Sequence, residues 1–246
     1  MVLRGAGRHK QSIAESSFDA WTKYYRQDEN SPNAIVSYYT KGSLVALALD
    51  LTMRNETQGK KSLDDVMRAL WQRYGRDFYT PKGGRGVTEA ELEALIEEIS
   101  GLKLKSRLDR WVRGTADLPL AELLAPYGVD LAEPGKASKP GLGVRAAREG
   151  NDCKLATVHE GQAAHKAGLS GGDLLVALDG LRVTAANLDK LLERYRVGDM
   201  VTLHAFRRDE LMQFSAKLMA DDVPKLEAKV AGKAAPMSRA RKGWLA

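Results

Sequence analysis

Residues 168–180 read GLSGGDLLVALDG, and residues 141–144 read GLGV. In the longer stretch, five apolar residues at 174–178 lie between the pair Gly-Asp and the pair Asp-Gly. Turn-forming pairs on both sides of a short apolar run predict a strand bounded by turns. The same reasoning predicts a small β-rich C-terminal domain, with strands at 143–147, 154–158, 201–207 and 213–217, a loop before residue 168, and a helix at 186–195.

The order of these features resembles a PDZ domain that covers residues 139–222. Glycines on both sides of Leu142 allow neighbouring backbone N–H groups to converge on a carboxylate, and the strand that follows offers a free edge to an extended peptide. The resemblance implies that Leu142, Gly143 and Val144 hold the terminus of a peptide. The residues that it assigns to the opposite wall of the groove are Leu188, Leu191 and Leu192.

The absence of one histidine narrows the range of ligands expected for this PDZ-like groove. No histidine opens the helix at 186–195, so the resemblance does not imply a Ser or Thr two residues before the peptide terminus. An apolar peptide or protein terminus is therefore the expected partner. The alternative is a groove that is empty or occupied by its own chain, because a fold does not establish a ligand.

The N-terminal half is predicted to be helical from residue 12 to about residue 127. Ser62 with Asp65, and Thr88 with Glu91, are N-cap residues followed three positions later by a carboxylate. Glycines at the far ends predict where these two helices stop. Together with helices at 34–54, 104–113 and 120–125, these signals predict an α+β multidomain protein.

Composition divides the chain into four parts. The boundaries that it predicts are a helical region at 1–131, a Pro/Gly/Lys/Ser linker at 132–140, the PDZ-like domain at 141–222, and a basic mobile tail at 223–246. The last 24 residues hold six cations and one anion, so most of the net charge of +6 belongs to the tail. A nearly neutral body argues against nucleic acid as a partner, and the longest uncharged stretches are too short to span a membrane.

The segment Tyr39-Thr40-Lys41-Gly42 carries the chemistry expected of the N-terminal half. With residues 11–13, 17–21 and 62–67, it resembles the C-terminal part of the catalytic region of the glycyl aminopeptidase family of zinc metallopeptidases, in which a PDZ domain follows. The resemblance implies a gluzincin-like helical subdomain in which Tyr39 donates a hydrogen bond to the oxyanion. A tyrosine that only packs at a helix start is the alternative for Tyr39, and Lys41 is expected to orient the segment.

The zinc-binding part of this family is missing from the sequence. No His-Glu-x-x-His occurs, and His159 and His165 are six residues apart rather than four. We therefore predict no metal or cofactor for this chain, although the family implies zinc in the complete protein. The expected function is the C-terminal portion of an aminopeptidase, inactive without its N-terminal catalytic part as a partner. The alternative is a non-enzymatic PDZ adaptor that binds peptide or protein termini.

The compartment is weakly constrained by the sequence. A single cysteine, Cys153, fits a reducing compartment such as the cytoplasm. The first residues lack the apolar core of a signal peptide, so any export signal is expected upstream.

Overall fold

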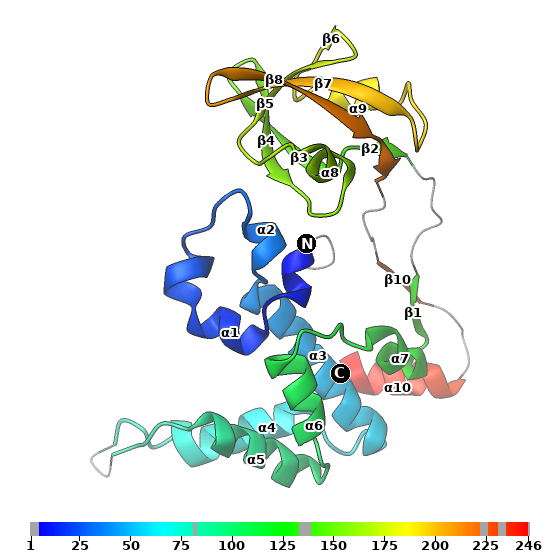
Figure 1. Cartoon of the computed structure of the whole chain (residues 1–246). Coiled ribbons are helices and arrows are strands. Elements are labelled where there is room, and N and C mark those ends of the chain that lie inside the picture. The colour runs from blue at the N-terminus through cyan, green and yellow to red at the C-terminus, as the bar shows by residue number, and fades with distance from the viewer. Residues whose placement is uncertain (1–4, 81–82, 133–138, 222–225, 231–234, 246) are drawn as a thin grey trace. The chain divides into compact units, whose positions relative to one another are not determined.

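The computed structural model describes residues 5–80, 83–132, 139–221, 226–230 and 235–245. It contains two units, and the chain passes from one to the other more than once. The PDZ unit comprises Met1–Gln11, Ser16–Val36 and Glu133–Lys225, and the helical unit comprises Ser12–Glu15, Ser37–Ala132 and Leu226–Ala246. Helices and strands both contribute, as Figure 1 shows, which confirms the predicted α+β class.

The helical unit is built on one long helix, α3 (Tyr38–Glu56). Its start is fixed by Ser37, whose side chain accepts a hydrogen bond from the N–H of Thr40 (3.2 Å). The remaining helices are α4 (Leu63–Leu70) with its continuation η4 (Trp71–Gly75), α5 (Glu89–Ser100), α6 (Lys105–Leu108) with η5 (Asp109–Arg113), and α7 (Leu120–Leu124) with η6 (Ala125–Tyr127). The segment before them includes α1 (Ile13–Phe18), at which the chain changes units.

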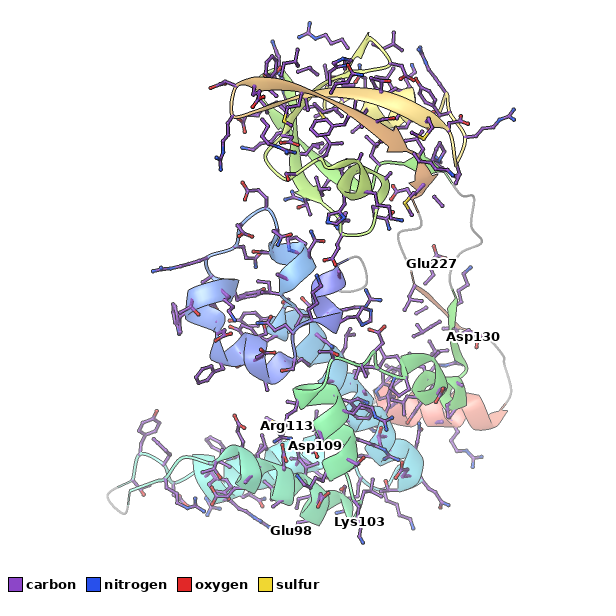
Figure 2. All side chains as sticks on the ribbon, viewed as in Figure 1. Glu98, Lys103, Asp109, Arg113, Asp130 and Glu227 are labelled. Carbon is purple, nitrogen blue, oxygen red and sulfur yellow. The ribbon has the colours of Figure 1, made fainter. Side chains whose placement is uncertain are left out.

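Leucines and other apolar side chains at helical spacing form the core of this unit. Leu49 and Met53 of α3 pack against Val66 of α4 and Ile96 of α5. Arg113 adds an ion pair with Asp109 one turn earlier (2.8 Å, Figure 2). The helix predicted at 104–113 is present, but its hydrogen-bonding pattern changes along its length. The first half, α6, is α-helical, and the second half, η5, is π-helical.

Two parts of the segment at 223–246, predicted to be a basic mobile tail, form regular structure. Residues Glu227–Val230 form strand β10, which pairs antiparallel with β1 (Val129–Ala132) in the helical unit. Residues Ala235–Leu245 form helix α10, and the ring of Trp244 packs against Tyr127 at 5.2 Å between centroids. Pairing and packing partners distant in the sequence supply the order that local periodicity does not predict.

The PDZ unit contains a sheet with strand order β3-β4-β5-β7-β8, all antiparallel. Its strands are β3 (Val144–Glu149), β4 (Asp152–Val158), β5 (Leu174–Leu178), β7 (Met200–Arg207) and β8 (Glu210–Lys217), with β6 (Leu181–Arg182) beside β5 and a separate pair, β2 (Pro140–Gly141) and β9 (Met219–Ala220). Two short helices, α8 (Ala163–Ala167) and α9 (Leu188–Leu192), accompany the sheet. The N-terminal part of the unit adds η2 (Ala6–His9), η3 (Ala20–Tyr24) and α2 (Ser31–Ala34).

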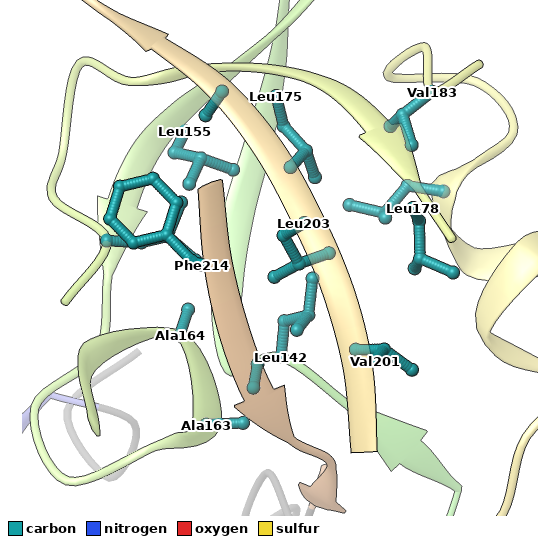
Figure 3. Packing of buried hydrophobic residues seen from close by; sticks show 14 of the residues in the cluster. Leu142, Leu155, Ala163, Ala164, Leu175, Leu178, Val183, Val201, Leu203 and Phe214 are labelled. Carbon is teal, nitrogen blue, oxygen red and sulfur yellow. The ribbon is translucent and has the colours of Figure 1, made fainter. Parts of the chain in front are cut away.

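One leucine-rich core holds the PDZ-like domain together. Leu155, Leu175 and Leu203 come from three neighbouring strands and are completely buried (Figure 3). Burying each such side chain contributes about 1.5–3 kcal/mol relative to an exposed position. This core explains why the apolar run at 174–178 decides the fold.

Two predictions for this domain were wrong in detail. The loop expected before residue 168 contains helix α8, which begins at Ala163, two residues after Gly161, a glycine with φ +77° that lets the chain turn into the helix. The helix expected at 186–195 is shorter and spans Leu188–Leu192, and the N–H groups of Arg194 and Tyr195 bond to carbonyl oxygens three residues earlier, as in turns.

Glu91 gives the helical unit an expected dependence on pH. Its ion pair with Arg85 (2.7 Å) and its hydrogen bonds with the backbone and side chain of Thr88 lower its pKa from 4.5 to about 2. Because the folded-state pKa is lowered, the stabilisation is present above about pH 4.5 and is lost as the pH falls towards 2. We expect Glu91→Gln to flatten the fall in Tm over this window, measured by circular dichroism.

The arginine variant tests the stated cause. Arg85→Met removes the largest contribution to the lowered pKa of Glu91, so it should flatten the same part of the profile less completely than Glu91→Gln. A Glu91→Gln variant whose Tm falls in parallel with that of the original protein would contradict the assignment.

Candidate functional site

Tyr39 lies in the first turn of α3, where the helix start holds it in a defined place. The tyrosine side chain is 58% exposed, and its ring stacks on that of Tyr38 with centroids 4.3 Å apart. The N-cap bond from Thr40 to Ser37 fixes the backbone on either side of it. An exposed tyrosine on a fixed helix turn suits a hydrogen-bond donor to substrate.

Lys41 supports this turn from inside the unit. Its residue is only 2% exposed, and its ammonium group lies 3.5 Å from the carbonyl oxygen of Thr115 in the segment after η5. A buried lysine is rare unless its charge is satisfied. Its burial agrees with the orienting role predicted for it and makes it unsuited to contact with substrate.

The described residues do not fit a zinc site. No group of three or more His, Cys, Asp or Glu side chains comes together within the parts of the chain that the structure describes. His165 accepts, through Nδ1, a hydrogen bond from the N–H of Gly161 (3.3 Å). Cys153 is buried in the PDZ core, where desolvation raises the pKa of its thiol. A zinc ion implied by the family would need ligands from elsewhere.

The first wall of the predicted groove is an edge strand. In the described sheet, β3 is paired only with β4, so its other edge is open. At its start, the carbonyl oxygens of Leu142 and Gly143 accept hydrogen bonds from Ala164 and His159 (both 2.9 Å). Within the described residues, the N–H groups of Leu142 and Gly143 donate no hydrogen bond to another backbone group outside the strands. These two N–H groups are therefore the candidate donors to a peptide terminus.

Gly143 is required at this position for two reasons. Its φ is +71°, and a Cβ there would lie 2.1 Å from Cβ of Gln162. Leu142, by contrast, is 1% exposed and points its side chain into the core (Figure 3), and Val144 is half-buried at the start of β3. Of the three residues predicted to hold a terminus, Leu142 and Gly143 offer backbone atoms, and Val144 begins the strand.

The second predicted wall lies deeper than expected. Leu188, Leu191 and Leu192 on α9 are 2%, 9% and 6% exposed, and all three belong to the PDZ core. Their burial follows from helical spacing, since the face of α9 that packs on the sheet must be apolar. As the domain stands, these side chains contribute chiefly to packing.

Sequence reasoning missed Asn33 of α2, which joins the N-terminal segment to the PDZ-like domain inside one unit. Its buried side-chain amide donates to the carbonyl oxygen of Val158 (2.8 Å) and accepts from the N–H of Glu160 (3.0 Å). Glu160 also forms an ion pair with Lys10. No local signal predicts these contacts, because the partners are more than a hundred positions apart.

A pocket of about 500 Å³ lies on another part of the PDZ-like domain, between α8 and the ends of β7 and β8. Its lining is mostly apolar, and includes Ala163, Lys166, Met200, Lys217, Leu218 and Met219. The Lys166 ammonium contacts the sulfur of Met219 (3.6 Å). The pocket includes none of the six residues predicted to bind a peptide.

The described helices were compared with the length and apolar character of a membrane-spanning helix. None of them combines the length and the continuous apolar character that a membrane-spanning segment needs.

Two separate parts of the chain match models of known protein families. Residues 1–45 match the family model described as M61 glycyl aminopeptidase, and residues 140–218 match that of the PDZ domain. No curated protein matches the chain.

Among solved structures, the chain is similar to an aminopeptidase N family protein from Idiomarina loihiensis, with 34% identity and a TM-score of 0.86. The match covers 100% of this chain but only 42% of that protein, so this chain spans less than half the length of its relative. The similarity to an HtrA-type protease with a decapeptide is much weaker, with 18% identity and a TM-score of 0.34 over 37% of this chain and 32% of that one. A serine endoprotease from Yersinia pestis has 15% identity and a TM-score of 0.25 over 32% of this chain and 30% of that one. The resemblance predicted from the sequence is therefore confirmed: the chain joins an M61 glycyl aminopeptidase segment to a PDZ domain.

Proposed function

We propose that this chain is the C-terminal portion of a zinc-dependent aminopeptidase, which hydrolyses peptide bonds at the N-termini of peptides. The observation that carries the proposal is the match of all of this chain to part of an aminopeptidase N family protein, together with the M61 segment at residues 1–45. The remainder of the enzyme supplies zinc, and this chain supplies Tyr39 and a peptide-binding PDZ domain.

Tyr39 serves as the donor to the oxyanion. When a peptide carbonyl is attacked by water, negative charge develops on the carbonyl oxygen, and a preorganised O–H group stabilises it. The exposure of Tyr39 at the start of α3 supports this role, and the buried Lys41 holds the turn that carries it. The same carbonyl would be polarised by a zinc ion held by the rest of the complete enzyme.

The isolated chain is expected to hold no stoichiometric zinc at neutral pH and to show no aminopeptidase activity. The reason is that no group of three or more possible zinc ligands comes together among the described residues. Elemental analysis after dialysis, with a peptide substrate assay on the same sample, measures both quantities. One tightly held zinc per chain, or turnover without added protein, would overturn the proposal.

The PDZ domain is proposed to bind peptides with a free, apolar C-terminus. Its donors are the N–H groups of Leu142 and Gly143, and its template is the open edge of β3. Amidation of the peptide terminus should weaken binding about tenfold or more, because charge-assisted hydrogen bonds are lost. Fluorescence anisotropy with labelled acid and amide peptides measures the ratio, and equal affinities would remove this role.

A pair of glycine variants tests the loop itself. Gly143→Ala places a methyl group against Gln162 at the mouth of the groove, and should abolish measurable binding. Gly150→Ala is the matched control, since Gly150 also has a positive φ (+61°) but has no atom near its Cβ position. If both variants bound alike, the loop would not be the binding element, and a non-enzymatic adaptor role through this groove would also fail.

A further inference from the structure

An aromatic surface in the N-terminal part of the PDZ unit is exposed to an unusual degree. Phe18 and Trp21 are 90% and 80% exposed, and Trp21 contacts the ring of Tyr25 at 5.1 Å between centroids. The three residues follow one another in the chain at spacings of three and four: Phe18 ends α1, Trp21 lies in η3, and Tyr25 is the residue directly after η3. We call Phe18, Trp21 and Tyr25 the aromatic face.

Such a surface is costly to leave in water. Single exposed apolar residues are ordinary, but large aromatic side chains gathered on one face mark interaction sites. Trp and Tyr are also the residue types that dominate the energy of protein interfaces. The ion pair between Asp19 and Lys23 lies between the aromatic positions, so the face has the polar surroundings of an interface.

The comparisons indicate what covers the aromatic face. It lies inside residues 1–45, the part of the chain that matches the M61 glycyl aminopeptidase model. More than half of the Idiomarina loihiensis relative lies outside the match to this chain. A family segment whose neighbours belong to another stretch of polypeptide would expose the side chains that pack against them.

We infer that the aromatic face is the docking surface for the zinc-bearing part of the same enzyme, the part of the relative that this chain does not cover. The inference rests on the proposed function, and it adds the surface through which the two parts meet. A second aromatic residue, Trp71 in η4, is 61% exposed but lies outside the M61 match. It is therefore the matched control.

The first test compares the chain alone with a chimera in which it replaces the matching 42% of the Idiomarina loihiensis protein. Both are treated with a reagent that oxidises exposed indole rings, and modification of Trp21 and Trp71 is followed by mass spectrometry. The rate at Trp21 should fall at least tenfold in the chimera, while the rate at Trp71 stays unchanged. Equal rates at Trp21 in both proteins would overturn the inference.

The second test does not depend on a folded chimera. The uncovered part of the relative, produced separately, should bind this chain, and Phe18→Ser with Trp21→Ser should weaken binding at least tenfold, whereas Trp71→Ser should not. Failure of the parts to bind, or equal effects of the two sets of variants, counts against the surface. Self-association of the chain that Phe18→Ser and Trp21→Ser abolish would also overturn it, with a second copy as the occupant.

These results separate the surface from the catalytic proposal. A chimera that protects Trp21 but holds no zinc, or hydrolyses no peptide, refutes the proposed function and leaves the docking surface standing. A chimera that is active while Trp21 remains fully reactive refutes only the surface.

Discussion

Replacing Tyr39 with Phe in the complete enzyme is expected to lower kcat by roughly 10²–10³, which corresponds to about 3–4 kcal/mol of lost transition-state stabilisation. The phenyl ring keeps its stacking on Tyr38, and the helix start keeps its Ser37 cap, so only the hydroxyl is removed. Zinc content should be unchanged, because Tyr39 is not a ligand. Steady-state kinetics and elemental analysis of the same preparation measure the two effects.

Tyr38 is the control for this prediction. It is the adjacent residue and the stacking partner of Tyr39, it is half-buried, and no catalytic role is proposed for its hydroxyl. Tyr38→Phe should therefore retain most of kcat. A loss with Tyr38→Phe alone would show that the wrong tyrosine was chosen, and no loss with either variant would remove the oxyanion role from this turn.

Local signals in the sequence predicted much of the helical unit. A capping box at Thr88 and a left-handed glycine at residue 101 start and stop α5 where the pattern expects. Such signals work because a helix end must satisfy its own backbone groups nearby. Strand β10 and helix α10 were missed because their order depends on residues about a hundred positions earlier, among them Tyr127.

The residues of the candidate site also differ in how far local sequence patterns predict them. The glycine-rich sequence around Leu142 agrees with the left-handed backbone at Gly143 (φ +71°), whereas the convergence of N–H groups on a carboxylate stays a prediction. The three leucines of α9 could not be separated into groove and core, since apolar residues suit both. Asn33 was beyond prediction altogether, because an amide that bridges Val158 and Glu160 leaves no pattern around itself.

The Gly-Asp pair before the apolar run at 174–178 also supplies the acidic member of a buried ion pair in the PDZ-like domain. The side chain of Asp173 is only 2% exposed. Its carboxylate accepts hydrogen bonds from Nε and Nη2 of Arg207 (2.9 and 2.8 Å) and from the N–H of Ser170 (2.8 Å). The pair raises the pKa of Arg207, whose guanidinium also donates to the carbonyl oxygen of Gly168 (2.8 Å).

Arg207→Met should destabilise this domain by about 3 kcal/mol, at the lower end of the range for removal of one partner of a buried pair, because the Arg207 side chain is itself 33% exposed. Methionine keeps much of the aliphatic stem, so the loss falls on the groups that the guanidinium contacts: the buried carboxylate, and the ring of Phe214, whose centroid lies 5.4 Å from the guanidinium carbon. Hydrogen exchange of the β5 and β7 amides reports the stability of this domain separately from that of the helical unit.

A double-mutant cycle decides whether the pair itself is responsible. Asp173→Asn removes the buried charge, so Arg207→Met should cost clearly less in that background than in the original protein. Arg182→Met on β6 is the matched control, since Arg182 is exposed and forms no ion pair within the described residues, and its effect should stay within about 0.5 kcal/mol. Additive costs around the cycle would mean that Arg207 stabilises the domain through its stem and its bond to Gly168, and that Asp173 is satisfied by the turn at Ser170 alone.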